Sequence, residues 1–174
     1  ERAGFIPSKD WREKEKKEPL YIGDTYHLSI GQGDLLVTPL QVNSYNSTIA
    51  NGGIIYRPHL VKAEILPNRS QKLMPVGIIR KNMVDPKNIE VVRQGMRQAV
   101  IYGSARGLND LPVAVAGKTG TAQWNSAKPN HAWFNGFAPF NNPTFSITVL
   151  GEEGGEGSST AAPIAKEIIN YWFG

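Results

Sequence analysis

The chain has 174 residues, a formal net charge of +4 and no cysteine. This length is sufficient for one domain with a buried core, and 40% hydrophobic with 20% charged residues excludes a disordered chain or a coiled coil. The lack of cysteine excludes disulfide scaffolds, thiolate metal sites, iron–sulfur clusters and cysteine nucleophiles. The apolar runs are short, and none reaches the length needed to span a bilayer.

The charged residues are unevenly distributed. Residues 1–20 hold six basic and five acidic side chains, a mixture typical of a solvated loop or a frayed helix. Residues 21–122 hold eleven basic and six acidic side chains, a net +5. This excess would suit an anionic polymer, but no cluster of Lys and Arg alternates with aromatic residues. We therefore expect no nucleic-acid partner.

Two helices are predicted in the first two thirds of the chain. The first begins at Thr38-Pro39, with Thr38 as N-cap and proline in the first turn, and ends at Asn51-Gly52-Gly53. The second begins at Asp85-Pro86 and ends at Gly103. Its apolar stripe comprises Ile89, Val92, Met96, Ala99 and Val100. The segment 54–66 between the two helices has the composition of a strand.

The last third of the chain predicts a sheet followed by a helix. Strand patterns cover residues 113–122, 131–140 and 145–149. The apolar face of the terminal helix is expected to comprise Ala161, Ile164, Ala165, Ile168 and Trp172. Short connections favour an antiparallel sheet with this helix packed on one side. The predicted fold class is therefore α+β or mixed α/β, with residues 1–174 in one domain.

The spacing of the glycines and histidines excludes the nucleotide-binding and metal-binding motifs that these residues could suggest. Gly117-Lys118-Thr119 cannot close a phosphate loop, because that loop needs glycine at position 112, which is proline. Gly31-Gln32-Gly33 lacks the third glycine of a dinucleotide fingerprint, since position 36 is leucine. The three histidines, His27, His59 and His131, lack metal-ligand spacing and are expected to be surface or packing residues. We expect neither a metal nor a cofactor.

The segment Lys118-Thr119-Gly120-Thr121 is suited to anion recognition on a strand. The ammonium group supplies a fixed positive charge, and the threonine hydroxyls can donate to a carboxylate. Gly120 would allow a substrate backbone to approach closely. An extended peptide could then pair with this strand as an added strand.

The surrounding sequence resembles the transpeptidase domain of class B penicillin-binding proteins. The segments that carry the resemblance are Gly23-Asp24-Thr25, Ser29-Ile30-Gly31-Gln32-Gly33, Thr38-Pro39-Leu40-Gln41, Ile49-Ala50-Asn51-Gly52-Gly53, Gly103-Ser104-Ala105, Ala116-Gly117-Lys118-Thr119-Gly120-Thr121-Ala122 and His131-Ala132-Trp133-Phe134-Asn135-Gly136-Phe137-Ala138-Pro139. These collinear matches cover the chain from about residue 20 to the terminal helix. The Ser-Ile-Gly-Gln-Gly form is more similar to the elongation-type proteins (penicillin-binding protein 2) than to the division-type ones.

The family uses three motifs: Ser-x-x-Lys, Ser-x-Asn and Lys-Thr-Gly. Only Lys-Thr-Gly is clearly present, because no serine of this chain has lysine three residues later. Ser44-Tyr45-Asn46 fits Ser-x-Asn in letters, but it lies within the predicted helix after Thr38-Pro39 and is interpreted as a coincidence. The resemblance therefore implies that the nucleophile lies upstream of Glu1. Residues 21–174 would be the matching C-terminal portion of one transpeptidase domain, preceded by the charged segment 1–20.

The resemblance implies a serine-type peptidoglycan D,D-transpeptidase, which is acylated by a D-Ala-D-Ala stem peptide and transfers the acyl group to an amine on a second stem peptide. Lys118 would hold the proton network and attract the substrate carboxylate, and the hydroxyls of Thr119 and Thr121 would bind that carboxylate. The backbone N–H of Thr121 would donate to the oxyanion. β-Lactams would inhibit the complete domain covalently. The family's location implies an extracytoplasmic (periplasmic) domain of a membrane-anchored parent.

Two alternatives stay open from the sequence. One is a non-catalytic relative, such as a β-lactam sensor or a degenerate interaction domain, and the other is a module whose basic middle binds an anionic polymer. Trp133 and Phe134 are interpreted as core residues rather than site residues. Without the upstream half, one face of the sheet is expected to be bare and the isolated chain to be inactive and poorly ordered.

Overall fold

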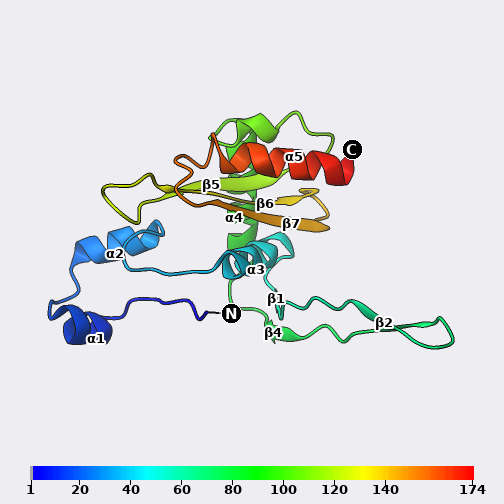
Figure 1. Cartoon of the computed structure of the whole chain (residues 1–174), viewed down its shortest axis with the longest axis horizontal. Helices are drawn as coiled ribbons and strands as arrows, with labels where there is room; N and C mark the ends of the chain where they lie inside the picture. Colours follow the sequence, from blue (N-terminus) through cyan, green and yellow to red (C-terminus); the bar gives the residue numbers. More distant parts are fainter. Residues whose placement is uncertain (1) are drawn as a thin grey trace.

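The structure, a computed structural model, describes residues 2–174 and is organised around a three-stranded antiparallel sheet. Its strands are β5 (Ala116–Ala122), β6 (His131–Ala138) and β7 (Phe145–Gly151), in the order β5-β6-β7 (Figure 1). Lys118 pairs with Asn135, and Asn135 pairs with Thr148. The predicted fold class and the three predicted strands are confirmed, although the first strand begins at residue 116 rather than 113.

Helix α5 (Ala161–Phe173) packs on one face of this sheet, as predicted. Phe134 and Ile147 of the sheet meet Ala165 and Ile169 of the helix in the main core cluster. The predicted apolar face of this helix is wrong in part. The buried residues are Ala161, Ala162, Ala165 and Ile169, and the exposed ones include Ile164, Ile168 and Trp172. Apolar residues surround this helix on most sides, so periodicity alone could not select the buried stripe.

Helix α3 (Pro39–Ala50) covers part of the opposite face, where it contacts β6 and β7, so the expectation of a bare sheet face is wrong in part. Its start follows the prediction: Thr38 and Gln41 form a capping box, and proline occupies the first turn. The fully buried Asn46 donates through Nδ2 to Gly136 O and to Ser146 Oγ, both at 2.8 Å. Polar side chains therefore join α3 to the sheet. Ser44-Tyr45-Asn46 lies within this helix, as expected, and its interpretation as a coincidental match stays a prediction.

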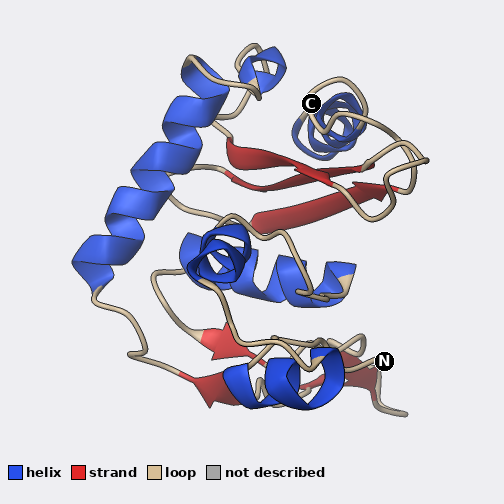
Figure 2. Cartoon of the chain, turned by 90° about the vertical axis from the view of Figure 1, so that its left-hand side faces the viewer, coloured by secondary structure: helices blue, strands red, loops and turns tan. Residues whose placement is uncertain are grey.

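Helix α4 (Pro86–Ile101) contacts β5 and runs along one side of the three-stranded sheet and helix α3 (Figure 2). Ile89, Met96 and Val100 of its predicted stripe are buried, but Val92 is about half exposed. The short helix η2 (Arg106–Leu108) follows and leads toward β5. Beyond it, Lys166 of α5 donates to Asp110 at 2.7 Å, and this hydrogen bond holds the pKa of the Asp110 carboxyl below its usual range.

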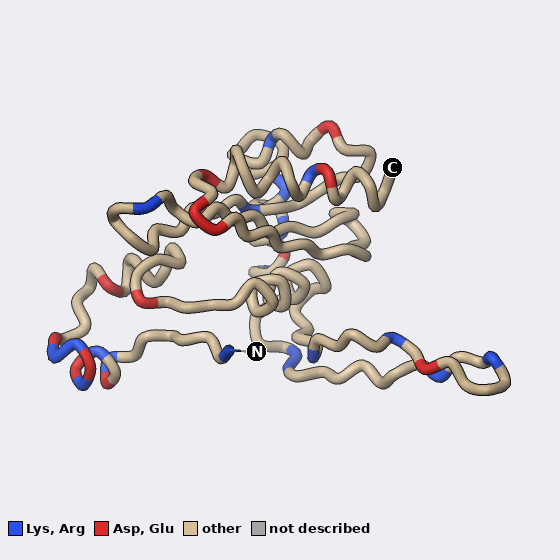
Figure 3. The backbone as a smooth tube through the Cα atoms, in the orientation of Figure 1, with Lys and Arg blue, Asp and Glu red and all other residues tan. Residues whose placement is uncertain are grey.

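Residues 54–84 form an arm that extends from the body (Figure 1). It is built from two antiparallel pairs: β1 (Ile55–Tyr56) with β4 (Ile78–Arg80), and β2 (Ala63–Ile65) with β3 (Gln71–Leu73). The sequence pattern predicted strand only up to residue 66 and missed the returning strands. The arm carries six Lys or Arg residues and one acidic residue, which accounts for much of the basic middle of the chain (Figure 3).

The N-terminal segment forms short helical turns: α1 (Lys9–Trp11), the π-turn η1 (Arg12–Lys16) and α2 (Ile22–Ser29). The side chain of Arg12 is only 16% exposed and pairs with the carboxylates of Glu18, Asp24 and Asp34 at 3.2–3.3 Å. A bridge between Phe5 and Leu36 also ties the beginning of the chain to the segment before α3. The charged N-terminal run is thus connected to the segment that leads into the candidate site.

Candidate functional site

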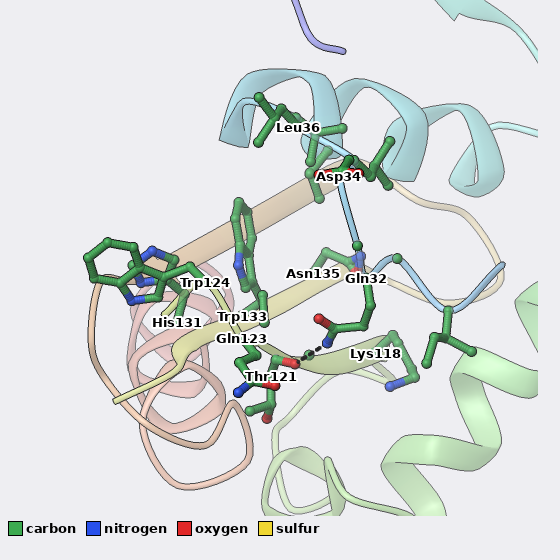
Figure 4. A pocket seen from close by; sticks show the side chains of 18 of the residues that line it. Gln32, Asp34, Leu36, Lys118, Thr121, Gln123, Trp124, His131, Trp133 and Asn135 are labelled. Carbon is green, nitrogen blue, oxygen red and sulfur yellow. Dashed lines mark hydrogen bonds between the residues drawn. The ribbon is translucent and has the colours of Figure 1, made fainter. Parts of the chain in front are cut away.

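Strand β5 lies at an edge of the sheet and forms one wall of a cleft of about 1150 Å³. Lys118 to Thr121 line this cleft together with the loop around Gln32 and with Trp133 of β6 (Figure 4). The Lys118 side chain is exposed, and none of the ion pairs among residues 2–174 involves it. The cleft therefore contains an ammonium group that no carboxylate of the described chain neutralises.

The backbone of β5 presents polar groups on its free edge. Gln32 Nε2 donates to Thr121 O at 2.9 Å (Figure 4), and Lys118 Nζ donates to Thr119 O. In an antiparallel strand, the N–H and C=O of one residue point to the same side. The N–H groups of Thr119 and Thr121 therefore point to the free edge of β5, as their carbonyl groups do.

The two glycines around Gln32 form a turn that the sequence motifs did not predict. Gly31 and Gly33 have φ angles of +77° and +79°, in the left-handed region that glycine adopts without strain. This double turn brings the Gln32 amide to β5, 89 positions later in the chain. Gln32 was not predicted as a site residue, because nothing local in Gly-Gln-Gly identifies so distant a partner.

The two threonine hydroxyls of β5 have different neighbours. Thr119 Oγ1 lies 2.6 Å from Ser104 Oγ, and either hydroxyl can be the donor. Thr121 Oγ1 donates to Glu156 Oε2 at 2.7 Å and accepts from the N–H of Gly157 at 3.5 Å. Glu156 belongs to the loop between β7 and α5, and neither it nor Ser104 was predicted as a site residue. The described structure thus places all four predicted residues, Lys118 to Thr121, along one edge and adds a carboxylate beside the last of them.

Gly120 is closely packed within the chain. A Cβ added there would lie 3.1 Å from Trp133 Cβ, a tight contact that would require Trp133 to shift by a few tenths of an ångström. On the other side, Gly157 lies so near that an added Cβ would overlap the carbonyl oxygens of Gly120 and Trp133. The strand at Gly120 is therefore held between Trp133 and the loop that carries Glu156.

Aromatic side chains form the end of the cleft near the β5–β6 connection. Trp124 stacks on His131 with ring centroids 5.1 Å apart, and Lys128 lies over Trp124. His131 Nδ1 accepts from the N–H of Glu153 at 2.9 Å. The interpretation of Trp133 as a core residue is wrong, because its side chain is only partly buried and lines the cleft. Phe134 also borders the cleft, but it is fully buried and belongs to the main core cluster. Strand alternation, which puts neighbouring side chains on opposite faces, could have separated the two.

The described residues contain no group of three or more His, Asp or Glu side chains positioned to hold a metal ion. Within residues 2–174, no helix combines the length and apolar character that crossing a bilayer requires.

Comparison with known proteins shows the family to which the chain belongs. The family model described as "Penicillin binding protein transpeptidase domain" matches residues 1–170. The chain belongs to the penicillin-binding protein transpeptidase family. The resemblance stated from the sequence is thereby confirmed.

Relatives of known name include penicillin-binding protein 2. The peptidoglycan D,D-transpeptidase MrdA of Haemophilus influenzae is 35% identical over 192 residues, covering 99% of this chain and 29% of that protein. The crystal structure of Pseudomonas aeruginosa penicillin-binding protein 2 in complex with WCK 5153 is 36% identical, with a TM-score of 0.81, covering 99% of this chain and 38% of the other. Penicillin-binding protein A of M. tuberculosis, solved as a penicillin G acyl-enzyme complex, is 32% identical, with a TM-score of 0.72 and coverage of 85% and 34%. The chain thus spans about a third of the length of these relatives.

Proposed function

We propose that this chain is the Lys-Thr-Gly-bearing portion of a peptidoglycan D,D-transpeptidase of the penicillin-binding protein 2 type. The observation that supports this most is the edge of β5. An unneutralised Lys118 ammonium, two hydroxyls and two N–H groups line one strand that faces a cleft, in a chain that matches the transpeptidase family over residues 1–170. These are the groups needed to hold a peptide carboxylate and to stabilise an oxyanion.

In the proposed reaction, a serine outside this chain attacks the carbonyl carbon between the two D-Ala residues of a stem peptide. The terminal D-Ala leaves with its amine, and an ester links the remaining peptide to the serine. The amine of a second stem peptide then attacks this ester, forms the cross-link and releases the serine. No serine of this chain has the lysine three residues later that the family's nucleophile requires.

The residues of β5 have separate roles in this proposal. Lys118 attracts the substrate carboxylate and takes part in the proton network around the serine. Thr119 and Thr121 bind the carboxylate through their hydroxyls, and the free-edge N–H of Thr121 donates to the oxyanion. Loss of one such oxyanion donor typically costs about 3 kcal/mol of transition-state stabilisation. Gly120 allows the extended peptide to lie close to the strand.

The remaining features of the complete protein are proposed on the same basis. The chain is the C-terminal portion of one transpeptidase domain and requires the upstream half, which supplies the nucleophile. β-Lactams acylate the complete domain, as penicillin G does in the M. tuberculosis relative. The substrate is peptidoglycan, and the domain acts on the extracytoplasmic side of the cytoplasmic membrane as part of a membrane-anchored protein.

Replacement of Lys118 by alanine in the complete protein tests this function. We expect the second-order rate constant for acylation by a fluorescent penicillin to fall by at least about 100-fold, because both the charge and the proton-transfer group are lost. The melting temperature should change by less than about 2 °C, since Lys118 is exposed and its ammonium group is held by no carboxylate.

Lys62→Ala is the matched control, because it removes the same charge from an exposed position on the arm. Its acylation rate should equal that of the unaltered protein. Near-normal acylation by Lys118→Ala with a lowered melting temperature would show that Lys118 is structural and would refute the proposed function.

A further inference from the structure

We propose that Glu156 is a positioning residue that sets the charge selectivity of the cleft, because its carboxylate competes with the ligand's carboxylate for the Thr121 hydroxyl. The inference rests on the proposed function, in which that hydroxyl binds the carboxylate of a stem peptide or a β-lactam. The relevant contact is the hydrogen bond from Thr121 Oγ1 to Glu156 Oε2 at 2.7 Å.

The chemistry of the two partners fixes the direction of this hydrogen bond. An ionised carboxylate can only accept hydrogen bonds, and a threonine hydroxyl has a single hydrogen to donate. While Glu156 is in place, that hydrogen is used, and the Thr121 hydroxyl cannot donate to a second carboxylate. A ligand carboxylate at Thr121 must therefore displace Glu156 and then lie close to its negative charge.

Thr119 provides a comparison within the same strand. Its hydroxyl is paired with Ser104 Oγ at 2.6 Å, and a serine can donate as well as accept. When Ser104 donates, the hydrogen of Thr119 stays available to a ligand. The two threonines are therefore not equivalent: Thr119 can bind a carboxylate without losing its partner, whereas Thr121 cannot.

The loop holds the Glu156 backbone in place and leaves its side chain free to turn away. The N–H groups of Ser159 and Thr160 donate to Glu156 O at 3.2 and 3.0 Å, at the entrance to α5. The adjacent Gly157 lies against the backbone of Gly120, and this packing keeps the loop against β5. The Glu156 side chain itself is exposed, so rotation into solvent is sufficient to release the Thr121 hydroxyl.

The test compares Glu156→Gln in the complete protein with two ligands, benzylpenicillin and its uncharged methyl ester. Glutamine keeps the size of the side chain but can donate to the Thr121 hydroxyl, which frees the hydroxyl hydrogen. We expect the second-order acylation rate constant for benzylpenicillin to rise about three- to tenfold, the range of one exposed hydrogen bond. The rate constant for the ester should rise less, because its carbonyl oxygen can accept from the Thr121 hydroxyl but the ester carries no charge for Glu156 to repel.

Glu152→Gln is the matched control, since it removes the same charge from the same loop at an exposed residue that does not contact Thr121. It should change neither rate constant. In a Thr121→Val background, Glu156→Gln should no longer accelerate benzylpenicillin. Glu156→Ala serves as a second variant. It should raise the ratio of the acylation rate constant for benzylpenicillin to that for the methyl ester, as Glu156→Gln does.

An unchanged or lowered rate for benzylpenicillin, or an equal increase for acid and ester, would overturn the inference and make Glu156 a structural residue of the loop. The Lys118→Ala variant separates this failure from that of the proposed function. If Lys118→Ala abolishes acylation while Glu156→Gln has no effect, only the inference about Glu156 fails. If the Lys118→Ala protein is acylated at the normal rate, the proposed function is refuted, and the inference about Glu156 that rests on it is refuted too.

Discussion

At the scale of single residues, the candidate site combines groups that are adjacent in sequence with groups that are distant. Lys118 to Thr121 could be predicted, because a strand pattern surrounds a charged and hydroxylated tetrapeptide. Gln32 and Glu156 could not be predicted, because they reach Thr121 across 89 and 35 positions of the chain. Local sequence patterns cannot predict contacts across such separations, because only the folded structure brings these side chains together.

Replacement of Thr121 by valine separates the hydroxyl from the backbone of this residue. Valine is nearly isosteric and favours strands, so the fold should persist while the hydroxyl donor is lost. We expect the acylation rate constant for benzylpenicillin to fall about 10-fold or more, within the range of a hydrogen bond to a charged group. Stopped-flow acylation alongside thermal melting measures both effects. An unchanged rate constant would mean that Thr121 acts through its backbone alone.

At the scale of secondary-structure elements, helices with clear capping residues could be predicted from the sequence, whereas short strands with exposed side chains could not. Helix α3 begins and ends close to the predicted residues, because Thr38 and Pro39 define its first turn and glycines follow its last. The arm was recognised only in part, since strands of two or three residues with exposed side chains produce no clear alternation. The register of α5 was wrong because its sequence is apolar on several faces.

Arg93 of α4 illustrates how elements are joined by a single side chain. Its guanidinium donates to the carbonyl oxygens of Ile49 and Ala50 at the end of α3 and to Phe140 O at 2.7 Å after β6. It also lies over the rings of Phe137 and Phe140, at 5.1 and 5.4 Å from their centroids. One residue therefore connects α4, α3 and the end of β6.

We predict that Arg93→Ala lowers the free energy of unfolding by about 2–4 kcal/mol, because carbonyl acceptors and two aromatic faces lose their cationic partner. Arg93→Lys should recover only a small part of this loss, since an ammonium group cannot reproduce the planar fork of donors. Denaturant unfolding of the complete protein measures the effect, with the exposed Arg80→Ala on the arm as control. A loss below about 0.5 kcal/mol would mean that Arg93 behaves as a surface residue.

At the scale of the whole molecule, the layers could be predicted in part. The antiparallel sheet with α5 on one side followed from short connections between strands. The covering of the other face by α3 did not, because the Asn46 hydrogen bonds that join them span 90 to 100 positions. The chain is a family member that spans 29% of the Haemophilus relative, and its cleft carries the proposed anion-binding edge without the proposed nucleophile.

In the proposed function, this chain recognises the acylating ligand while a serine elsewhere in the protein reacts with it. The most direct test is to label the complete protein with a penicillin, digest it, and locate the adduct by mass spectrometry. We expect one stoichiometric acyl adduct, on a serine followed three residues later by lysine, in a peptide outside residues 1–174. A stoichiometric adduct on any serine from Ser8 to Ser159 of this chain would contradict it.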